Sequence, residues 1–371
     1  MKKIIAAGHI CLDITPIIPG DRSQPLEELL VPGKLLHVGR ADVHSGGSVA
    51  NTGLALKLLG EDVTLMGKIG NDAFGSVLRE QLARYGAGGL LTDPEAETSY
   101  SVVLAPPGID RIFLHNPGAN DSFSSADVPE EALADAVLFH FGYPPLMRRM
   151  YSNDGEELAA LFRRVREKQA ATSLDLAGVD PDSDAGKADW EAILARVLPD
   201  TDFFLPSFEE LCFMLDREKY NRLRARAGSG DMLSDHPDFE KDVKPLAERA
   251  LGMGCPAVII KCGTGGIYYQ TADLPALRRI GRKLEIDPEL WENREGVQPC
   301  FHVEAVRSAT GAGDAAIAAF LSAAVRGYPP EACVMFAAAE GACSVTGYDA
   351  LSGLLPLPEL EKKIRAGWPT R

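Results

Sequence analysis

An acidic residue follows three small residues in the stretch SATGAGDAAIAAFLSAAVRG, residues 308–327. The small residues are Gly311, Ala312 and Gly313, the acid is Asp314, and the apolar run after them predicts a buried helix. The preceding segment CFHVEAV predicts a strand, so Asp314 is expected where a strand leads into a helix N-terminus. Unpaired backbone N–H groups and the helix dipole favour an anion there. The glycines let a phosphate approach the main chain, and Asp314 is suited to accept the proton of a hydroxyl that attacks this phosphate.

The same residues allow two other interpretations. The stretch could be a tight turn in which Asp314 only caps the helix. Gly311, Gly313 and Ala316 also satisfy a loose dinucleotide-binding pattern, although that pattern normally opens the first βα unit of a domain and here follows residue 300. The sequence G-x-x-x-x-G-K-[ST] occurs nowhere in the chain, which excludes ordinary P-loop chemistry.

A second glycine-rich stretch, SGGSVANTGLALKLLG, lies early in the chain. Gly46 and Gly47 precede an expected helix that carries Asn51 in its first turn. Backbone donors and an amide side chain would converge there, and a polyhydroxy ligand could bind them. The alternative is that the glycines only mark the start of the helix.

Elements that would position these residues alternate between strand-like and helix-like segments, which predicts an α/β fold with a largely parallel sheet. The expected strands are 3–13, 62–70, 136–142, 171–177, 201–206 and 256–263. The expected helices are 48–60, 74–86 and 156–169. Residues 33–45 and 98–117 look extended and are expected to form a small sheet over the main body. Residues 216–245 and 277–299 are charged and turn-rich, and they are expected to be surface insertions.

Composition limits the classes of partner. The chain has 371 residues, 46% hydrophobic and 25% charged, which is typical of a soluble globular protein of one large α/β domain. A formal net charge of -15 argues against nucleic acid or an anionic membrane as a partner. The seven cysteines are scattered without a C-x-x-C pair, which predicts neither disulfides nor zinc and fits the cytoplasm. No apolar run approaches the ~20 residues of a membrane span.

Together, the early Gly-Gly-x-x-x-Asn and the late Gly-Ala-Gly-Asp resemble the two signatures of the ribokinase-like (PfkB) family of carbohydrate and nucleoside kinases. The resemblance covers nearly the whole chain. It implies one three-layer α/β domain over 1–371, with a β lid formed by about 13–45 and 98–117. It also implies ATP-dependent phosphoryl transfer, with Mg²⁺, to a hydroxymethyl group of a sugar or nucleoside.

The resemblance assigns roles to particular residues. Asp314 matches the general base, and the amides of Gly311, Ala312 and Gly313 match the anion hole for the transferring phosphoryl group. The residues that match or lie near the family's acceptor site are Asp13, Gly46, Gly47, Asn51 and Arg111. Those that match its nucleotide site are Lys261, Gly263, Gly266, Ser207 and Glu210, with Glu210 acting on magnesium through a water.

Several positions depart from the family pattern. Ser308 and Ala309 stand where the family usually has Asp-Thr, which leaves the need for a monovalent cation open. Ser207 replaces the usual Asn of Asn-x-x-Glu. An acid that holds ribose in some members is missing near Gly142 and Tyr143.

The alternatives to a kinase are a non-catalytic sugar-sensing protein of the same fold and, ranked last, a nicotinamide-dependent oxidoreductase. An exposed lid edge also favours a homodimer.

Overall fold

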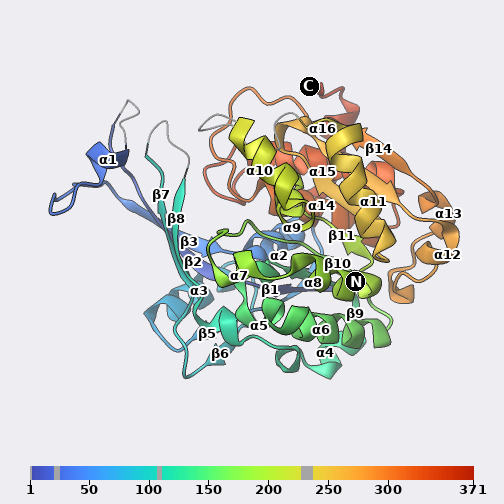
Figure 1. Ribbon diagram of the computed structural model, residues 1–371, viewed down its shortest axis with the longest axis horizontal. Helices are drawn as coiled ribbons and strands as arrows, with labels where there is room; N and C mark the ends of the chain where they lie inside the picture. The colour runs from blue at the N-terminus through green and yellow to red at the C-terminus, as the bar shows by residue number, and fades with distance from the viewer. Residues whose placement is uncertain (1, 21–25, 107–110, 227–236) are drawn as a thin grey trace.

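The computed structural model describes residues 2–20, 26–106, 111–226 and 237–371 (Figure 1). Their main sheet has the strand order β14-β13-β12-β11-β10-β9-β1-β4. Its strands are β1 (Lys3–Gly8), β4 (Asp62–Met66), β9 (Ala136–Gly142), β10 (Ala171–Leu174), β11 (Phe203–Phe204), β12 (Ala257–Lys261), β13 (Ile267–Thr271) and β14 (Glu295–Gln298). Neighbours from β4 to β12 are parallel, whereas β13 is antiparallel to both β12 and β14. The predicted α/β fold with a mostly parallel sheet is confirmed.

Helices cover both faces of this sheet. On β1, Ile4 and Ala6 face one apolar cluster, while Ile5 and Ala7 face the other. This alternation arises because successive strand residues point to opposite faces, and the strand is therefore apolar throughout. Helices of the first cluster are α2 (Ser48–Leu58), α3 (Ala73–Ala83), α14 (Ala312–Val325), α15 (Pro330–Ser344) and α16 (Leu357–Arg365). Helices of the second are α6 (Glu156–Glu167), α8 (Trp190–Val197), α9 (Phe208–Leu215) and α11 (Lys244–Gly252).

Shorter helices connect or flank these layers. They are α1 (Leu26–Leu29), α4 (Glu130–Asp135), α5 (Arg148–Tyr151), α7 (Asp184–Lys187), α10 (Arg217–Arg226), α12 (Leu274–Leu277) and α13 (Pro288–Trp291). Among the described residues, no helix combines the length and the hydrophobicity that crossing a membrane requires.

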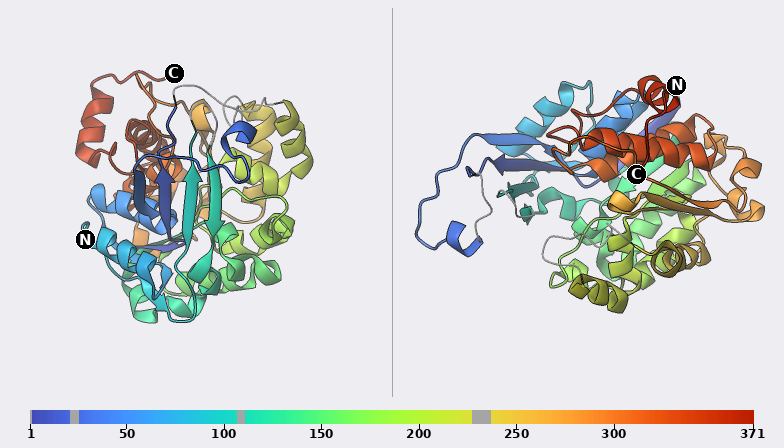
Figure 2. Two further views of the ribbon diagram at one scale, coloured as in Figure 1. Left: turned by 90° about the vertical axis from the view of Figure 1, so that its left-hand side faces the viewer. Right: turned by 90° about the horizontal axis from the view of Figure 1, so that it is seen from above.

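A second sheet, called the lid sheet below, projects to one side of the body (Figures 1 and 2). Its order is β3-β2-β7-β8, and its strands are β2 (Cys11–Pro16), β3 (Ala41–Gly46), β7 (Tyr100–Leu104) and β8 (Ile112–Asn116). A two-stranded sheet of β5 (Lys68–Gly70) and β6 (Leu91–Asp93) lies near its base.

The expectation of a single strand over 3–13 is wrong. The segment forms β1 of the main sheet and then continues into β2 of the lid sheet. Gly8 has φ 125° and lies so close to β9 that a Cβ on it would be 2.3 Å from the Gly142 carbonyl oxygen. This conformation, which a glycine adopts readily, lets the chain leave the main sheet after β1 and enter the lid sheet at β2. The first strand therefore positions both the body and the lid.

Two other expectations about elements are wrong. Residues 300–306 form no strand, since Phe301 makes only an isolated bridge to Thr370. Part of the segment 277–299 is integral to the fold, because β14 is the edge strand of the main sheet and Trp291 is buried. Local composition suggested a surface insertion there, but an edge strand has one solvent-exposed side and tolerates polar residues.

Candidate active site

Asp314 lies in the first turn of α14 and is buried. Its carboxylate accepts three hydrogen bonds from outside that helix: Asn51 Nδ2 donates to Oδ2 (3.1 Å), Thr52 Oγ1 to Oδ1 (3.0 Å) and Tyr143 Oη to Oδ2 (2.8 Å). The N-cap residue of α14 is Gly311, so Asp314 is not the residue that caps the helix. Asp314 is thus held by α2 and by the residue that follows β9, so capping does not explain its place.

Burial raises the pKa of Asp314 above the ordinary value of an aspartate. The hydrogen bond from Tyr143, the charge of Lys261 and the bonds from Asn51 and Thr52 oppose this rise but do not cancel it. A carboxylate with a raised pKa is a stronger base than an exposed one.

The glycines before Asp314 bring main chain close to other groups. Gly311 has φ 75°, and a Cβ on it would lie 2.3 Å from the Ala350 Cβ. A Cβ on Gly313 would instead meet Lys261 Nζ at 3.7 Å. The first N–H groups of an α-helix have no partner within the helix. Here Ala312 N donates to the Ala309 carbonyl oxygen outside it (3.4 Å), and the Gly313 main chain lies beside the ammonium of Lys261.

Lys261 ends β12 and forms an ion pair with Asp175, whose Oδ1 is 2.7 Å from Lys261 Nζ. Burial alone would lower the pKa of this lysine, but Asp175, Glu210 and Asp314 raise it on balance, so it carries its charge. Burial raises the pKa of Asp175 against the opposing charge of Lys261. Asp175 is a site residue that sequence reasoning missed, although its position directly after the buried strand β10 is a signal that could have found it.

Glu210 and Ser207 form a capping box at the start of α9. Ser207 N donates to Glu210 Oε2 (2.7 Å), and Glu210 N donates to Ser207 Oγ (3.2 Å). Ser207 also forms an isolated parallel β-bridge with Lys261. The serine therefore keeps the helix start that an asparagine would form, and Glu210 remains close enough to influence the charge of Lys261 and Asp175.

The donor set suits a magnesium ion that is held chiefly by phosphates. Among the described residues, no group of three or more His, Cys, Asp or Glu side chains could hold a metal by itself. Magnesium commonly binds through one or two carboxylates, water and the phosphates of a substrate. Glu210 and Asp175 supply such carboxylates near Lys261.

The expected nucleotide loop divides into two parts. Lys261 points toward Asp175, whereas Gly263 and Gly266 form the turn that leads from β12 to β13. Gly266 has φ 105°, and a Cβ on it would lie 2.2 Å from the Gln298 carbonyl oxygen. Lys261 thus lies beside Gly313 at the start of α14, and the glycines shape the adjoining turn.

The expected acceptor residues come together at the base of the lid sheet. A Cβ on Gly46 would lie 2.1 Å from Asp13 Oδ2, so only glycine leaves room for this carboxylate. Gly47 has φ 82° and is the N-cap of α2, whose first turn carries Asn51. Asp13 therefore lies against Gly46 just before α2, and Asn51 in the first turn of that helix connects to Asp314 through its hydrogen bond.

A row of polar side chains crosses the inner face of the lid sheet. Register pairs His44 with Asp13, Asp13 with Ser101, and Ser101 with His115, so these four residues point to one side. His115 Nδ1 is 3.0 Å from Ser101 Oγ, and His115 Nε2 is 3.3 Å from His9 Nε2.

Burial lowers the pKa of both His9 and His115, so the pair is uncharged at neutral pH. Sequence reasoning missed the pair, because nothing local indicates that residues more than a hundred positions apart meet.

Arg111 connects the lid to the loop before α14. Its Nη1 donates to Thr310 Oγ1, and its guanidinium carbon lies 5.7 Å from the centre of the Phe113 ring. Arg111 therefore lies between the lid sheet and the Gly-Ala-Gly-Asp stretch.

The missing acid near Gly142 has a steric explanation. A Cβ on Gly142 would lie 1.7 Å from Ser48 Oγ, so no side chain fits there. The next residue, Tyr143, adopts φ 65° and directs its hydroxyl to Asp314. Burial, together with Asp314 and Asp175, raises the pKa of Tyr143, which therefore stays protonated as a hydrogen-bond donor.

The chain is similar to known proteins over most of its length. Residues 1–356 match the model of the pfkB family of carbohydrate kinases. An uncharacterized sugar kinase of Archaeoglobus fulgidus is 24% identical over 305 residues, which are 81% of this chain and 98% of that protein. Fructokinase-1 of Zea mays is 32% identical over 146 residues, 38% of this chain and 41% of that protein.

Solved structures show the same fold. Ribokinase from Thermotoga maritima has a TM-score of 0.69 at 20% identity, covering 98% of this chain and 100% of that one. Fructokinase from Xylella fastidiosa with bound ATP has a TM-score of 0.70 at 21% identity and covers 98% of each chain. The match of the family model over nearly the full length shows that this chain belongs to the pfkB family of carbohydrate kinases.

Proposed function

We propose that the protein transfers the γ-phosphoryl group of ATP to a hydroxymethyl group of a sugar or nucleoside, with Asp314 as the general base. The observation that carries this proposal is the place of the Asp314 carboxylate. It is buried between the acceptor residue Asn51 and the N-terminal amides of α14, next to Lys261. A base and an anion-binding group are therefore adjacent, as in-line phosphoryl transfer requires.

In this mechanism the acceptor hydroxyl lies against Asp314, which takes its proton as the new oxygen–phosphorus bond forms. The bond from the γ-phosphorus to the β,γ-bridging oxygen breaks, and ADP leaves. The amides of Gly311, Ala312 and Gly313, with Lys261, stabilise the negative charge on the transferring group. Magnesium would neutralise phosphate charge, and Glu210 would orient it through a water molecule.

The acceptor end of the site favours an uncharged molecule. Asp13 and Asp314 are acidic, whereas His9 and His115 are neutral at pH 7 because burial lowers the pKa of each. Arg111 lies between the lid sheet and the Gly-Ala-Gly-Asp stretch, where it contacts Thr310. We therefore expect sugars or nucleosides, rather than sugar acids, to be phosphorylated. A screen of ADP release over hexoses, ketohexoses, pentoses, sugar acids and nucleosides with magnesium tests this.

Changing Asp314→Asn tests the role of the base directly. The amide cannot accept the proton, so kcat is expected to fall on the order of 1,000-fold or more while ATP binding is largely kept. The measurement is coupled ADP release with calorimetry of ATP binding. An unchanged kcat would contradict the role of Asp314. Ligand binding without ADP release by the unaltered protein, for every acceptor tried, would favour the sugar-sensing alternative.

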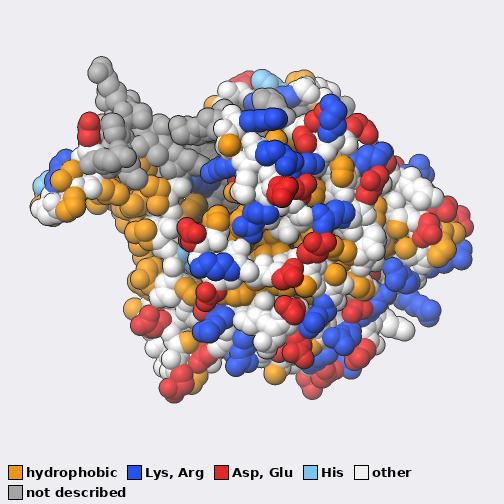
Figure 3. All heavy atoms as spheres, viewed as in Figure 1, with side chains coloured by type: hydrophobic (Ala, Val, Ile, Leu, Met, Phe, Trp, Pro, Cys, Tyr) orange, Lys and Arg blue, Asp and Glu red, His pale blue; other side chains and the backbone are white. Residues whose placement is uncertain are grey.

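We also propose that the protein works as a homodimer in the cytoplasm. The outer face of the lid sheet is apolar, with Val43 and Leu114 exposed and Ile14, Val102 and Ile112 half-buried. Figure 3 shows hydrophobic side chains gathered along this part of the molecule. A second copy of the same face would cover it. All seven cysteines are free, which agrees with a reducing compartment.

A further inference from the structure

A hollow of about 330 Å³ lies at the end of the main sheet opposite the candidate active site. Arg166, Gln169 and residues 278–282 (RRIGR) line it. It adjoins the N-terminal ends of β10 and β11, whereas Asp175 and Ser207 follow the C-terminal ends of these strands. The hollow and the candidate active site are therefore separated by the length of the strands.

Positive charge is concentrated at this hollow in a chain with a net charge of -15. Arg278, Arg279 and Arg282 are exposed, and within the described part of the chain none forms an ion pair with a carboxylate. Arg166 differs, because Asp200 and Asp202 lie 3.5 Å and 3.4 Å from its guanidinium nitrogens. Asp200 and Asp202 thus pair with Arg166. The positive charges of the other three arginines are not balanced by these acids.

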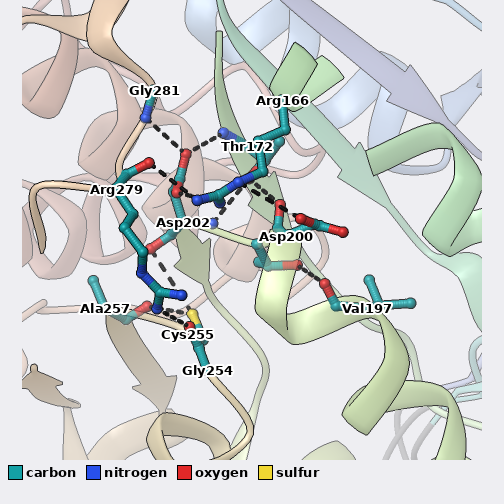
Figure 4. Close-up of polar contacts among 11 residues, drawn as sticks. Arg166, Thr172, Val197, Asp200, Asp202, Gly254, Cys255, Ala257, Arg279 and Gly281 are labelled. Carbon is teal, nitrogen blue, oxygen red and sulfur yellow. Dashed lines mark hydrogen bonds and ion pairs between the residues drawn. The ribbon is translucent and has the colours of Figure 1, made fainter. Parts of the chain in front are cut away.

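The loop that carries these arginines is held in place by buried groups (Figure 4). Asp202 is fully buried, and its Oδ2 accepts hydrogen bonds from Gly281 N (3.1 Å) and Thr172 N (3.0 Å). A Cβ on Gly281 would lie 2.2 Å from Ala171 N, so the loop lies directly against the start of β10.

The side chains of the hollow are braced as well. Arg166 Nη2 donates to the Arg279 carbonyl oxygen (3.2 Å), and Arg279 Nη2 donates to the Gly254 carbonyl oxygen (3.1 Å). Figure 4 shows Arg166 directed to Asp200 and Asp202, and the Arg279 side chain directed to Gly254. The backbone of the hollow is therefore formed before any ligand arrives, which lowers the entropy cost of binding.

We propose that this hollow binds a small phosphorylated anion. Guanidinium groups match the geometry of phosphate oxygens and bind them through paired charge-assisted hydrogen bonds. Arg278 and Arg282 flank the pinned residue Gly281 and supply free donors for this purpose. The proposal concerns a second site and does not depend on the phosphoryl transfer proposed above.

The test is a calorimetric titration of the full-length protein that has been saturated with ADP, so that the nucleotide site is filled. Separate titrations use inorganic phosphate, inorganic pyrophosphate and fructose 1,6-bisphosphate, which distinguish a free phosphate from a phosphorylated sugar. The double variant Arg278→Ala/Arg282→Ala is compared with Arg222→Ala/Arg224→Ala on α10, which changes the net charge equally. Kinase activity is measured for both, because neither pair belongs to the catalytic machinery.

We expect saturable binding of at least one probe to the unaltered protein and to the α10 variant, weakened about tenfold or more in the Arg278/Arg282 variant. The probe that binds most tightly identifies the source of the phosphate. The proposal is overturned if no probe binds saturably, or if both variants bind equally well.

Discussion

At the scale of single residues, the environment of Asp314 decides its chemistry. Three donors from two other elements converge on one carboxylate, and Tyr143 gives the shortest of these hydrogen bonds at 2.8 Å. Burial raises the pKa of the acid, and the tyrosine hydroxyl limits that rise. The same residue thus has to be basic enough to take a proton and still ionised when the acceptor arrives.

In the proposed mechanism, the phenol of Tyr143 therefore influences the pH range of activity. A base must be ionised, so kcat/KM is expected to fall as pH drops through the pKa of Asp314. Changing Tyr143→Phe removes a hydrogen bond that lowers this pKa, so the acidic limb moves to higher pH. The plateau rate is expected to change by less than about tenfold. The measurement is a pH profile of kcat/KM, with Tyr151→Phe as a control, and an unmoved limb would contradict the assignment.

At the scale of elements, the start of α14 combines two glycines with different tasks. Gly311 has a positive φ, and a Cβ on it would clash with Ala350. Glycine is therefore required at this position for conformational and steric reasons. At Gly313 a Cβ would meet Lys261 only at an ordinary contact distance. The requirement for glycine there therefore comes from the anion that is proposed to bind. Stability and activity should therefore respond separately at these two positions.

Alanine at each position separates the two demands. Gly311→Ala is expected to lower the free energy of unfolding by about 1–3 kcal/mol, because of the left-handed backbone and the contact with Ala350. Gly313→Ala is expected to keep that free energy, since alanine favours the helix, but to lower kcat on the order of 100-fold. Urea unfolding and steady-state kinetics measure both. Equal loss of stability in the two variants would show that the second glycine is structural.

At the scale of the whole molecule, buried acids couple the fold to pH. Glu340 on α15 is fully buried, and its Oε1 accepts a hydrogen bond from Leu355 N (3.0 Å). Its Oε2 has no hydrogen-bond partner among the described residues. Burial raises the pKa of this glutamate to about 8. The folded state thus holds a proton that the unfolded chain releases, and stability is lost as pH rises from the unfolded pKa through about 8.

Changing Glu340→Gln removes this loss. The variant keeps an acceptor for Leu355 N and carries no charge, so its melting temperature is expected to exceed that of the unaltered protein at pH 9. At pH 5 the two should be nearly equal, because Glu340 is then protonated in the folded state. Thermal unfolding at several pH values measures this, with the more exposed Glu331→Gln as control. A constant difference at all pH values would contradict the buried proton.

The homodimer also belongs to this scale. Changing Leu114→Glu places a charge on the exposed apolar face of the lid sheet and is expected to shift the protein from dimer to monomer. Analytical ultracentrifugation measures the shift. A protein that is monomeric before the change, at concentrations well above those of the assay, would contradict the proposal.

The sequence by itself determined the features that depend on neighbours along the chain. Apolar periodicity predicted α2, α3, α6 and most strands of the main sheet, because such periods reflect which face an element buries. The two glycine motifs pointed to the family and to Asp314, since close main-chain approach needs glycine at fixed positions.

Only the tertiary structure decided which distant groups meet. The bonds from Tyr143 and Thr52 to Asp314, the Lys261–Asp175 pair and the row from Asp13 to His115 all join separate elements. Their partners lie far apart in the chain, and no local pattern records such contacts. The same reason explains the strand that divides after Gly8 and the edge strand β14, because both depend on which backbone lies alongside rather than on local composition.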